Sequence, residues 1–209
     1  CIGALTACTP WVDRVSENVT GDPEISVGHT VQVVNPFITP DGRFVAFAST
    51  ATNLVSSPAF DGSYLQIYLV DRDLGTVNMV SVNNQGLPAG PQAGDSGCGG
   101  VGSCGSQYPS ISADGRFVGF QSYADNLGEA DVGGHQASAI TNIFVRDTCF
   151  GAPPAIGCVP RTLHVSRALS TQPVIRSTGI YPAISGDGRW VVFHSQFAAN
   201  ALAQGGSSN

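Results

Sequence analysis

Residues 35–49 read NPFITPDGRFVAFAS, and this pattern decides the fold because the chain repeats it twice. It recurs as YPSISADGRFVGFQS at 108–122 and as YPAISGDGRWVVFHS at 181–195, so that successive copies lie 73 residues apart. Each copy holds two short runs rich in β-branched and aromatic residues on either side of an Asp-Gly pair, which predicts two strands joined by a tight turn. A repeat of this period indicates a fold built from stacked copies of one structural unit.

A second block completes the unit. Residues 66–73 (QIYLVDRD) resemble 142–148 (NIFVRDT), and the segments that follow them, 77–82 and 163–167, share a Val-Ser step. Residues 12–16 (VDRVS) resemble the same last segment. Each unit therefore predicts four short strands, because the runs are short, are rich in β-branched and aromatic residues and are bounded by turn signals.

The turn between the first two strands of each unit carries an aspartate and a glycine. Glycine accepts a positive φ without penalty, and Asp-Gly is a strong hairpin signal. We therefore interpret these six residues as turn chemistry and predict no catalytic role for the aspartates. They are Asp41 and Gly42, Asp114 and Gly115, and Asp187 and Gly188.

The second strand of each unit has apolar residues on both faces, as in Phe117-Val118-Gly119-Phe120 and Trp190-Val191-Val192-Phe193. Such a strand has to be covered on both sides. Four-stranded sheets that stack face to face around an axis provide this cover, so the sequence predicts an all-β fold, a β-propeller segment of about three four-stranded blades. The alternative is an all-β sandwich, which would not require a sequence repeat.

The P-x-I-S-x-D-G-R-[FW]-V-x-F-x-S block, followed by an [IF]-[YF]-[LV]-x-[DR]-D strand, resembles the WD40-like (PD40) repeat of TolB-like β-propellers. That resemblance implies an envelope or secreted bacterial protein. It does not imply one activity, because such propellers serve in binding, in scaffolds and as parts of enzymes. The N-terminal domain that TolB carries before its propeller has no counterpart in this sequence.

The repeats divide the chain, taken as one propeller region over 1–209, into successive parts. These are the end of a preceding blade plus a linker (1–34), a blade (35–82), a Gly-rich insertion loop with a disulfide (83–107), a second blade (108–167) and a partial blade (168–209). Natural propellers have 4–8 blades. About three blades form an open arc with apolar ends, so we expect protein partners, further blades of a longer chain, or further copies to cover them. In the last case, the final strand of one copy could complete the sheet of the next.

Six cysteines form three close pairs, and we predict three local disulfides: Cys1–Cys8, Cys98–Cys104 and Cys149–Cys158. The intervening residues are rich in Gly, Pro and Ala, and the spacing does not match CxxC or mixed Cys/His metal sites. Disulfides indicate an oxidising compartment, namely the extracellular space, the cell surface or the periplasm.

Composition excludes several classes of function. The 209 residues carry a formal net charge of −6, and all nine basic residues are arginine, which argues against a nucleic-acid partner. No apolar run approaches the length of a membrane helix, so we expect no membrane span.

Candidate catalytic and metal sites are weak. Neither a G-x-S-x-G nor an H-E-x-x-H motif occurs, and the four histidines (His29, His135, His164 and His194) are scattered along the sequence. Calcium is the one cofactor worth considering, because Asp61-Gly62 and the loop at 129–134 place carboxylates before a strand. We otherwise expect no cofactor and no metal.

The sequence therefore favours a non-catalytic structural or protein-binding module, part of a larger surface assembly or filament. Two alternatives stay open. One is an accessory propeller of a secreted hydrolase or peptidase, and the other is a propeller that binds a glycan or small ligand.

Overall fold

The computed structural model describes residues 12–26, 30–90, 105–124, 126–127, 141–153, 157–166 and 179–195. Over these ranges the chain is all-β, with ten strands in three antiparallel sheets and no helix. The first sheet has the order β1 (Val33–Ile38), β2 (Phe44–Ser49), β3 (Gln66–Asp71) and β4 (Thr76–Met79). The second has the order β5 (Ser106–Ile111), β6 (Phe117–Ser122), β7 (Asn142–Asp147) and β8 (Arg161–His164). The third pairs β9 (Gly179–Ile184) with β10 (Val191–Ser195).

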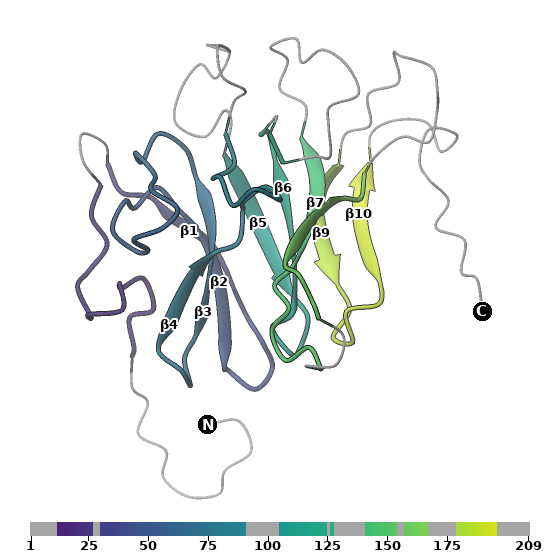
Figure 1. Cartoon of the computed structure of the whole chain (residues 1–209), viewed down its shortest axis with the longest axis horizontal. Helices are drawn as coiled ribbons and strands as arrows, with labels where there is room; N and C mark the ends of the chain where they lie inside the picture. Colours follow the sequence, from purple (N-terminus) through teal and green to yellow (C-terminus); the bar gives the residue numbers. More distant parts are fainter. Residues whose placement is uncertain are drawn as a thin grey trace, which may run out of the picture.

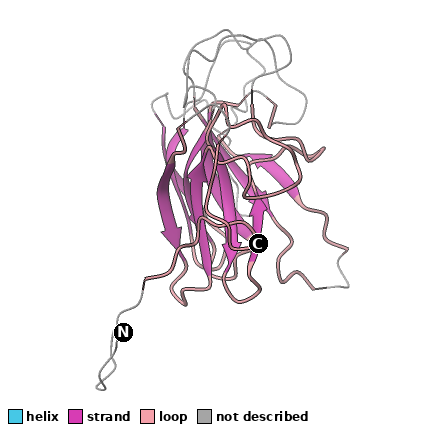
Figure 2. Ribbon diagram, turned by 90° about the vertical axis from the view of Figure 1, so that its left-hand side faces the viewer, coloured by secondary structure: helices cyan, strands magenta, loops and turns pink. Residues whose placement is uncertain are grey.

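The three sheets lie side by side in sequence order, with the first at the left of Figure 1 and the third at the right. Figure 2, seen from the side, shows the strands lying roughly along one common axis, with neighbouring strands antiparallel. The first strands of the three sheets are neighbours in space, since β1 contacts β5 and β5 contacts β9. Over the described ranges the sheets do not close into a ring.

Each of these first strands contains the same irregularity. Asn35, Tyr108 and Tyr181 adopt φ values of 55°, 52° and 55°, and each precedes the proline of the repeat. The pairing with the second strand shifts register at this point in all three sheets. Proline cannot donate to the ladder, so a bulge is the place in a strand where it is tolerated. The bulge brings the Tyr108 and Tyr181 rings edge to face, with 4.8 Å between their centroids.

The core lies between the sheets. One apolar cluster joins the facing sides of the first two sheets and includes Phe44, Ile67, Val118 and Phe120, each at most 2% exposed. A second cluster lies on the opposite face of the first sheet and is covered in part by Val15 from the N-terminal segment. The prediction that the second strand is buried on both faces is thus confirmed for β2, all six of whose residues are buried.

Successive sheets are also joined by a repeated backbone hydrogen bond. The N–H of Ser106, the first residue of β5, donates to the carbonyl of Leu65 at 2.7 Å. The N–H of Gly179, the first residue of β9, donates to the carbonyl of Thr141 at 2.9 Å. Leu65 and Thr141 both directly precede the third strand of their sheet. The contact between the first and second sheets is therefore repeated between the second and third.

The structure adds detail at two of the predicted boundaries. β1, β5 and β9 each begin two residues before the repeat pattern, because the bulge lets the strand pair on both sides of the proline. Residues 83–90 lie at the start of the predicted insertion loop (83–107). They form a compact turn in which Asn83 caps the backbone N–H groups of Gln85 and Leu87, and Val82 pairs with Pro88.

The same turn occurs in the N-terminal segment, where the repeat pattern did not indicate it. Glu17 pairs with Pro23, and Asn18 accepts the N–H groups of Thr20 and Asp22. Two asparagines hold these turns: Asn53 bonds the backbone of residues 23 and 25, and Asn126 bonds that of residues 88 and 90. Residues 16–24 therefore have the same position relative to the first sheet as residues 81–89 have relative to the second.

Candidate interaction surface

The Asp-Gly pairs form three equivalent turns. Gly42, Gly115 and Gly188 have φ values of 76°, 74° and 70°, which is the region that only glycine enters readily. In the first turn the carboxylate of Asp41 accepts hydrogen bonds from the Thr39 hydroxyl at 2.6 Å and the Arg43 N–H at 3.0 Å.

Hydrogen bonds within the turns lower the pKa values of two of the turn carboxylates. The Thr39 hydroxyl, followed by the Arg43 N–H, holds the pKa of Asp41 below its usual range, and the Ser185 hydroxyl does the same to the pKa of Asp187. Asp114 makes the matching bonds to Ser112 and Arg116. All three aspartates therefore have the turn geometry that the repeat predicts, and Oδ1 of each accepts both hydrogen bonds within the turn.

The turn glycines of the second and third sheets also receive an aromatic ring from the sheet before them. A Cβ on Gly115 would lie 2.6 Å from the ring of Phe44, and one on Gly188 would lie 2.4 Å from the ring of Phe117. Phe44 and Phe117 hold the same position at the start of the second strand in their sheets. Only a residue without a Cβ allows the ring this close, so the glycine serves both the turn and the contact between sheets.

A third aromatic holds this position in the third sheet and has no ring partner within the described residues. Trp190 is 60% exposed, although Phe44 is 2% exposed. Val192 and His194 follow it on the same face and correspond to Ala46 and Ala48, which are fully buried.

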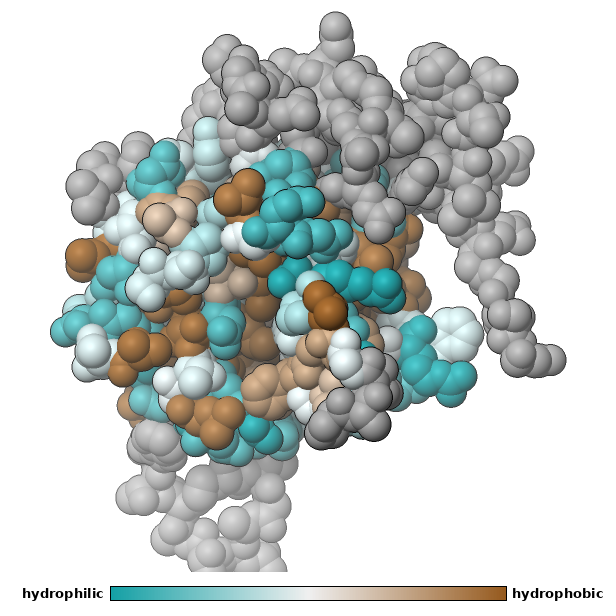
Figure 3. Space-filling model, viewed as in Figure 1, coloured by the Kyte–Doolittle hydropathy of each residue, from teal (hydrophilic) through white to brown (hydrophobic). Residues whose placement is uncertain are grey.

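We call Trp190, Val192 and His194 the open face. Val192 is 65% exposed, and His194 is exposed as well. In the space-filling view apolar residues reach the surface in several patches, including the region of β9 and β10 (Figure 3). Exposed apolar area of this kind marks interaction sites on protein surfaces.

An arginine and an aspartate join the second and third strands of each complete sheet. Arg43 donates two hydrogen bonds to the carboxylate of Asp71, at 3.0 and 2.8 Å. Arg116 donates two to Asp147, each at 2.9 Å. Each guanidinium also lies over the ring of the next residue, 4.7 Å from the Phe44 centroid and 4.8 Å from that of Phe117. We assign each pair a structural role, because its guanidinium and its carboxylate are bonded to each other.

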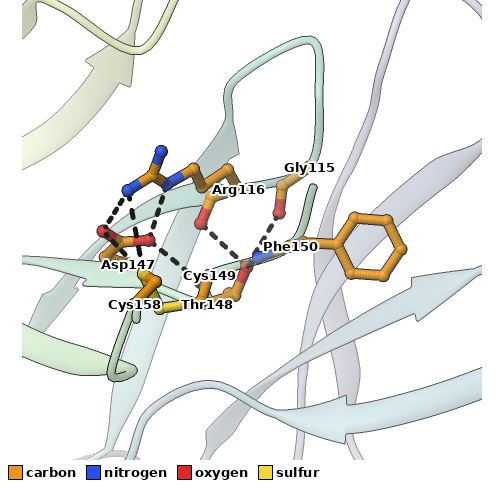
Figure 4. Close-up of a disulfide and its surroundings, with 7 residues drawn as sticks. All are labelled: Gly115, Arg116, Asp147, Thr148, Cys149, Phe150 and Cys158. Atoms are coloured by element: carbon orange, nitrogen blue, oxygen red, sulfur yellow. Dashed lines mark hydrogen bonds and ion pairs between the residues drawn. A yellow bond between two sulfur atoms is a disulfide. The ribbon is translucent and has the colours of Figure 1, made fainter. Parts of the chain in front are cut away.

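The Cys149–Cys158 disulfide, which was predicted, lies beside the second of these pairs (Figure 4). The N–H of Cys149 donates to Asp147, and the hydroxyl of Thr148 donates to the carbonyls of Gly115 and Arg116. Asp147, Cys149 and Cys158 are the one group of potential metal ligands close together in the described part of the chain. The two sulfurs are bonded to each other, so they are not thiolates and do not form a metal site.

Other candidate residues fall in different places. Cys1, Cys8, Cys98 and Cys104 lie outside the described residues, as do His29, His135 and the acidic loop at 129–134. Asp61 is exposed and caps the N–H of Ser63. His164 stacks on Phe144 with 4.9 Å between ring centroids, and its ring nitrogen is 3.3 Å from the hydroxyl of Ser166.

A cavity of about 500 Å³ lies where the first strands end. Ile38, Ile111 and Ile184 line it together with the first turn. Its lining holds one carboxylate, that of Asp41, which is already bonded within its own turn. It therefore offers apolar contact and no convergent set of polar groups of the kind that orients a small ligand.

Sequence reasoning missed the Arg–Asp pairs, and it expected apolar ends of the arc without identifying the residues of the open face. The pairs had a detectable signal, since the arginine after each Asp-Gly and the aspartate that ends the third strand keep their places in both complete units. The open face had no local signal, because Trp190 holds the position of an aromatic residue that packs against the next sheet in the other two units.

No family model matches the chain, and no curated protein matches it. Among solved structures, the chain is similar to one from a study described as "Structural and Mechanistic Analysis of Two Prolyl Endopeptidases: Role of Inter-Domain Dynamics in Catalysis and Specificity". The two are 13% identical with a TM-score of 0.39, and the match covers 79% of this chain and 19% of that one. The chain thus spans a small part of the length of the solved protein that it matches, and the likeness assigns no activity to it.

Within the described residues, no helix has the length and apolar character needed to cross a bilayer. The disulfide is compatible with a protein outside the cytoplasm, where thiols are oxidised.

Proposed function

We propose that this chain is a segment of a TolB-like β-propeller that works as a non-catalytic, protein-binding structural module in the periplasm, at the cell surface or outside the cell. Two features support the propeller. The sheets follow one another with repeated contacts, and the first strands of all three lie together. In a propeller these strands line the central channel.

One observation carries the binding role. The third sheet exposes Trp190 and Val192 at the positions where the first sheet buries Phe44 and Ala46 against its neighbour. At roughly 25 cal/mol per Å² of apolar surface, a face of this kind gains several kcal/mol when another sheet covers it. The function that the surface supports best is therefore to bind protein through the open face.

Photo-crosslinking tests this role. A photoreactive phenylalanine placed at Trp190 in the cell that makes the protein is expected to form covalent adducts with polypeptide, identifiable by mass spectrometry. The matched control places the same group at Leu74, which is 62% exposed in the turn between β3 and β4. Adducts at the control position but none at position 190 would contradict a binding role for the open face.

The same purified protein tests the absence of catalysis. We expect no turnover of peptide, ester or glycoside substrates above the rate of a Trp190→Asp variant, because the open face carries no nucleophile with a base beside it. Turnover that follows the protein through purification would instead support a hydrolase.

A further inference from the structure

The structure points to a specific occupant of the open face, and we infer that it is a second copy of this chain, bound through the first sheet. This inference rests on the proposed binding function and names its partner. The contacts between the first and second sheets and between the second and third sheets show how successive sheets pack. They therefore indicate which residues a partner needs in order to pack on the open face.

The contacts impose two requirements on an incoming sheet. Its first turn must carry a glycine that accepts the aromatic ring, as Gly115 accepts Phe44 and Gly188 accepts Phe117. Its first strand must also end in an isoleucine that packs on the preceding sheet. Ile111 is 3% exposed in the cluster between the first two sheets, and Ile184 lies against Gly119.

The first sheet of this chain meets both requirements and has neither contact filled by the described residues. Among the described residues, a Cβ on Gly42 would have no aromatic ring within 4 Å and would meet the Arg72 guanidinium. Ile38 is 55% exposed. We call Ile38 and Gly42 the complementary surface, because it carries the isoleucine and the turn glycine that receive an aromatic residue of the preceding sheet.

The N-terminal segment adds a second, independent observation. In the two complete sheets the hydroxyl of the serine two residues after the last strand, Ser81 or Ser166, accepts the N–H of the second residue of the third strand. Ser16 occupies the same position in its own segment, but its hydroxyl donates to Glu24 at 3.0 Å. Residues 12–16 thus resemble the last strand of a sheet whose other strands are supplied from elsewhere.

The N-terminal segment lies on the face of the first sheet that an incoming sheet would cover. Val15 packs against the cluster that contains Val45, and Ile38 is the cross-strand partner of Val45, so all three share the face opposite to the second sheet. Val45 is 5% exposed beneath this cover, whereas Ile38 is open. An incoming third sheet would meet Ile38 and Gly42 at the inner part of the face, next to the segment that resembles a last strand.

The contact joins two different surfaces, so it is head-to-tail and each copy keeps one surface of each kind. The described residues of each copy form three sheets, so two copies supply six, a number within the range of natural propellers. We therefore expect a closed ring of two copies, in which Trp190 of each copy packs on Gly42 of the other.

Variants at the two surfaces test this arrangement by light scattering and sedimentation velocity. The wild-type chain is expected at about twice its mass of 21.5 kDa. Trp190→Asp and Ile38→Asp each remove one surface and are expected to raise the dissociation constant on the order of 100-fold. Leu74→Asp introduces the same charge at an exposed apolar residue outside both surfaces and is expected to leave the mass doubled. Circular dichroism verifies that all variants are folded.

A mixture of the two monomeric variants gives the decisive measurement. Trp190→Asp protein keeps an intact complementary surface, and Ile38→Asp protein keeps an intact open face. Mixed together, they are expected to form a heterodimer with one intact contact, so association returns although neither variant associates alone.

Four results would overturn the inference. The first is a monomeric wild-type chain, the second is a Trp190→Asp variant that still associates, and the third is an open chain of many copies. An Ile38→Asp variant that stays dimeric would show that two open faces meet each other, which also overturns it. If the wild type is monomeric but position 190 still crosslinks to other proteins, only self-association fails and the proposed function stands.

Discussion

The ring of Phe44 lies directly against the backbone of Gly115, with 2.6 Å between a ring carbon and the position that a Cβ would take. This contact holds the first sheet to the second, and Phe150 closes it with its ring edge-on to Phe44 at 5.0 Å. One glycine therefore fulfils two needs that arise from different levels of structure. The turn needs its positive φ, and the neighbouring sheet needs its missing side chain.

The first prediction separates these two needs. Gly115→Ala and Gly75→Ala both place a Cβ at a positive φ (74° and 63°), and each is expected to lose roughly 1–2 kcal/mol of stability through backbone strain. Gly75 has nothing within 4 Å of the new atom, whereas Gly115 faces a buried ring. Gly115→Ala should therefore lose a further 1–3 kcal/mol, roughly, to overpacking. Urea unfolding measures both, and equal losses would show that the ring contact contributes nothing.

The second prediction concerns the arginine–aspartate pairs. Asp147→Asn removes the charge that receives two bonds from Arg116 and one from the Cys149 N–H. Asp147 is 7% exposed, so water replaces these bonds poorly, and the variant should unfold with about 1–3 kcal/mol less free energy. Asp73→Asn provides the control, because Asp73 has an exposed side chain 3.4 Å from Arg43. Unchanged stability in Asp147→Asn would contradict the structural role of the pair.

The third prediction is a pH dependence. Hydrogen bonds from Arg43 and Arg116 lower the pKa values of Asp71 and Asp147 in the folded chain. A carboxyl whose pKa is depressed by folding stabilises the protein fully above its unfolded pKa, about 3.9, and loses that contribution as the pH falls further. Thermal melts should show stability falling steadily from about pH 4.5 downward. The acid loss should be smaller in Asp147→Asn, and an identical slope would contradict the assignment.

The fourth prediction concerns the disulfide. Replacing both Cys149 and Cys158 with serine frees a loop with a sequence separation of 9 residues. The chain-entropy argument gives a loss of roughly 2–3 kcal/mol, because the unfolded chain regains the freedom that the bond removed. When both proteins are kept under reducing conditions, the wild type should match the double variant in urea. A reduced wild-type protein as stable as the oxidised one would show that the bond does not stabilise the second sheet.

The fifth prediction tests the two hydrogen bonds by which Asn126 holds the turn at residues 83–90. Asn126 accepts the Gly90 N–H at 3.0 Å and donates to the Pro88 carbonyl at 2.8 Å. Asn126→Ala leaves both backbone groups without this partner and should reduce stability by about 1–3 kcal/mol. Asn78→Ala, at an exposed position of β4, is the control. Hydrogen exchange at the Gly90 N–H should accelerate in Asn126→Ala and not in Asn78→Ala. A Gly90 N–H that stays protected in Asn126→Ala would contradict the role of Asn126.

Short stretches of sequence determine the local structure of this protein. Asp114 and Gly115 form their turn because the carboxylate bonds the residues beside it and glycine tolerates the φ that the turn requires. The antiparallel pairs follow from the turns, and the Cys149–Cys158 bond joins two cysteines close in the chain. These features depend on near neighbours in sequence, so the repeat pattern predicted them.

Whether a residue in the repeat is buried depends on another sheet, and only the tertiary structure decided it. Phe44 and Trp190 hold the same place in the pattern, yet one is 2% exposed and the other 60%. The Asn18 and Asn83 turns carry an asparagine, a glycine and a proline at the same spacing, but only the tertiary structure showed that Asn53 and Asn126 hold them from distant parts of the chain. Burial arises from surfaces that meet across long separations in sequence, and that is why the pattern predicted the strands but could not show which face remains open.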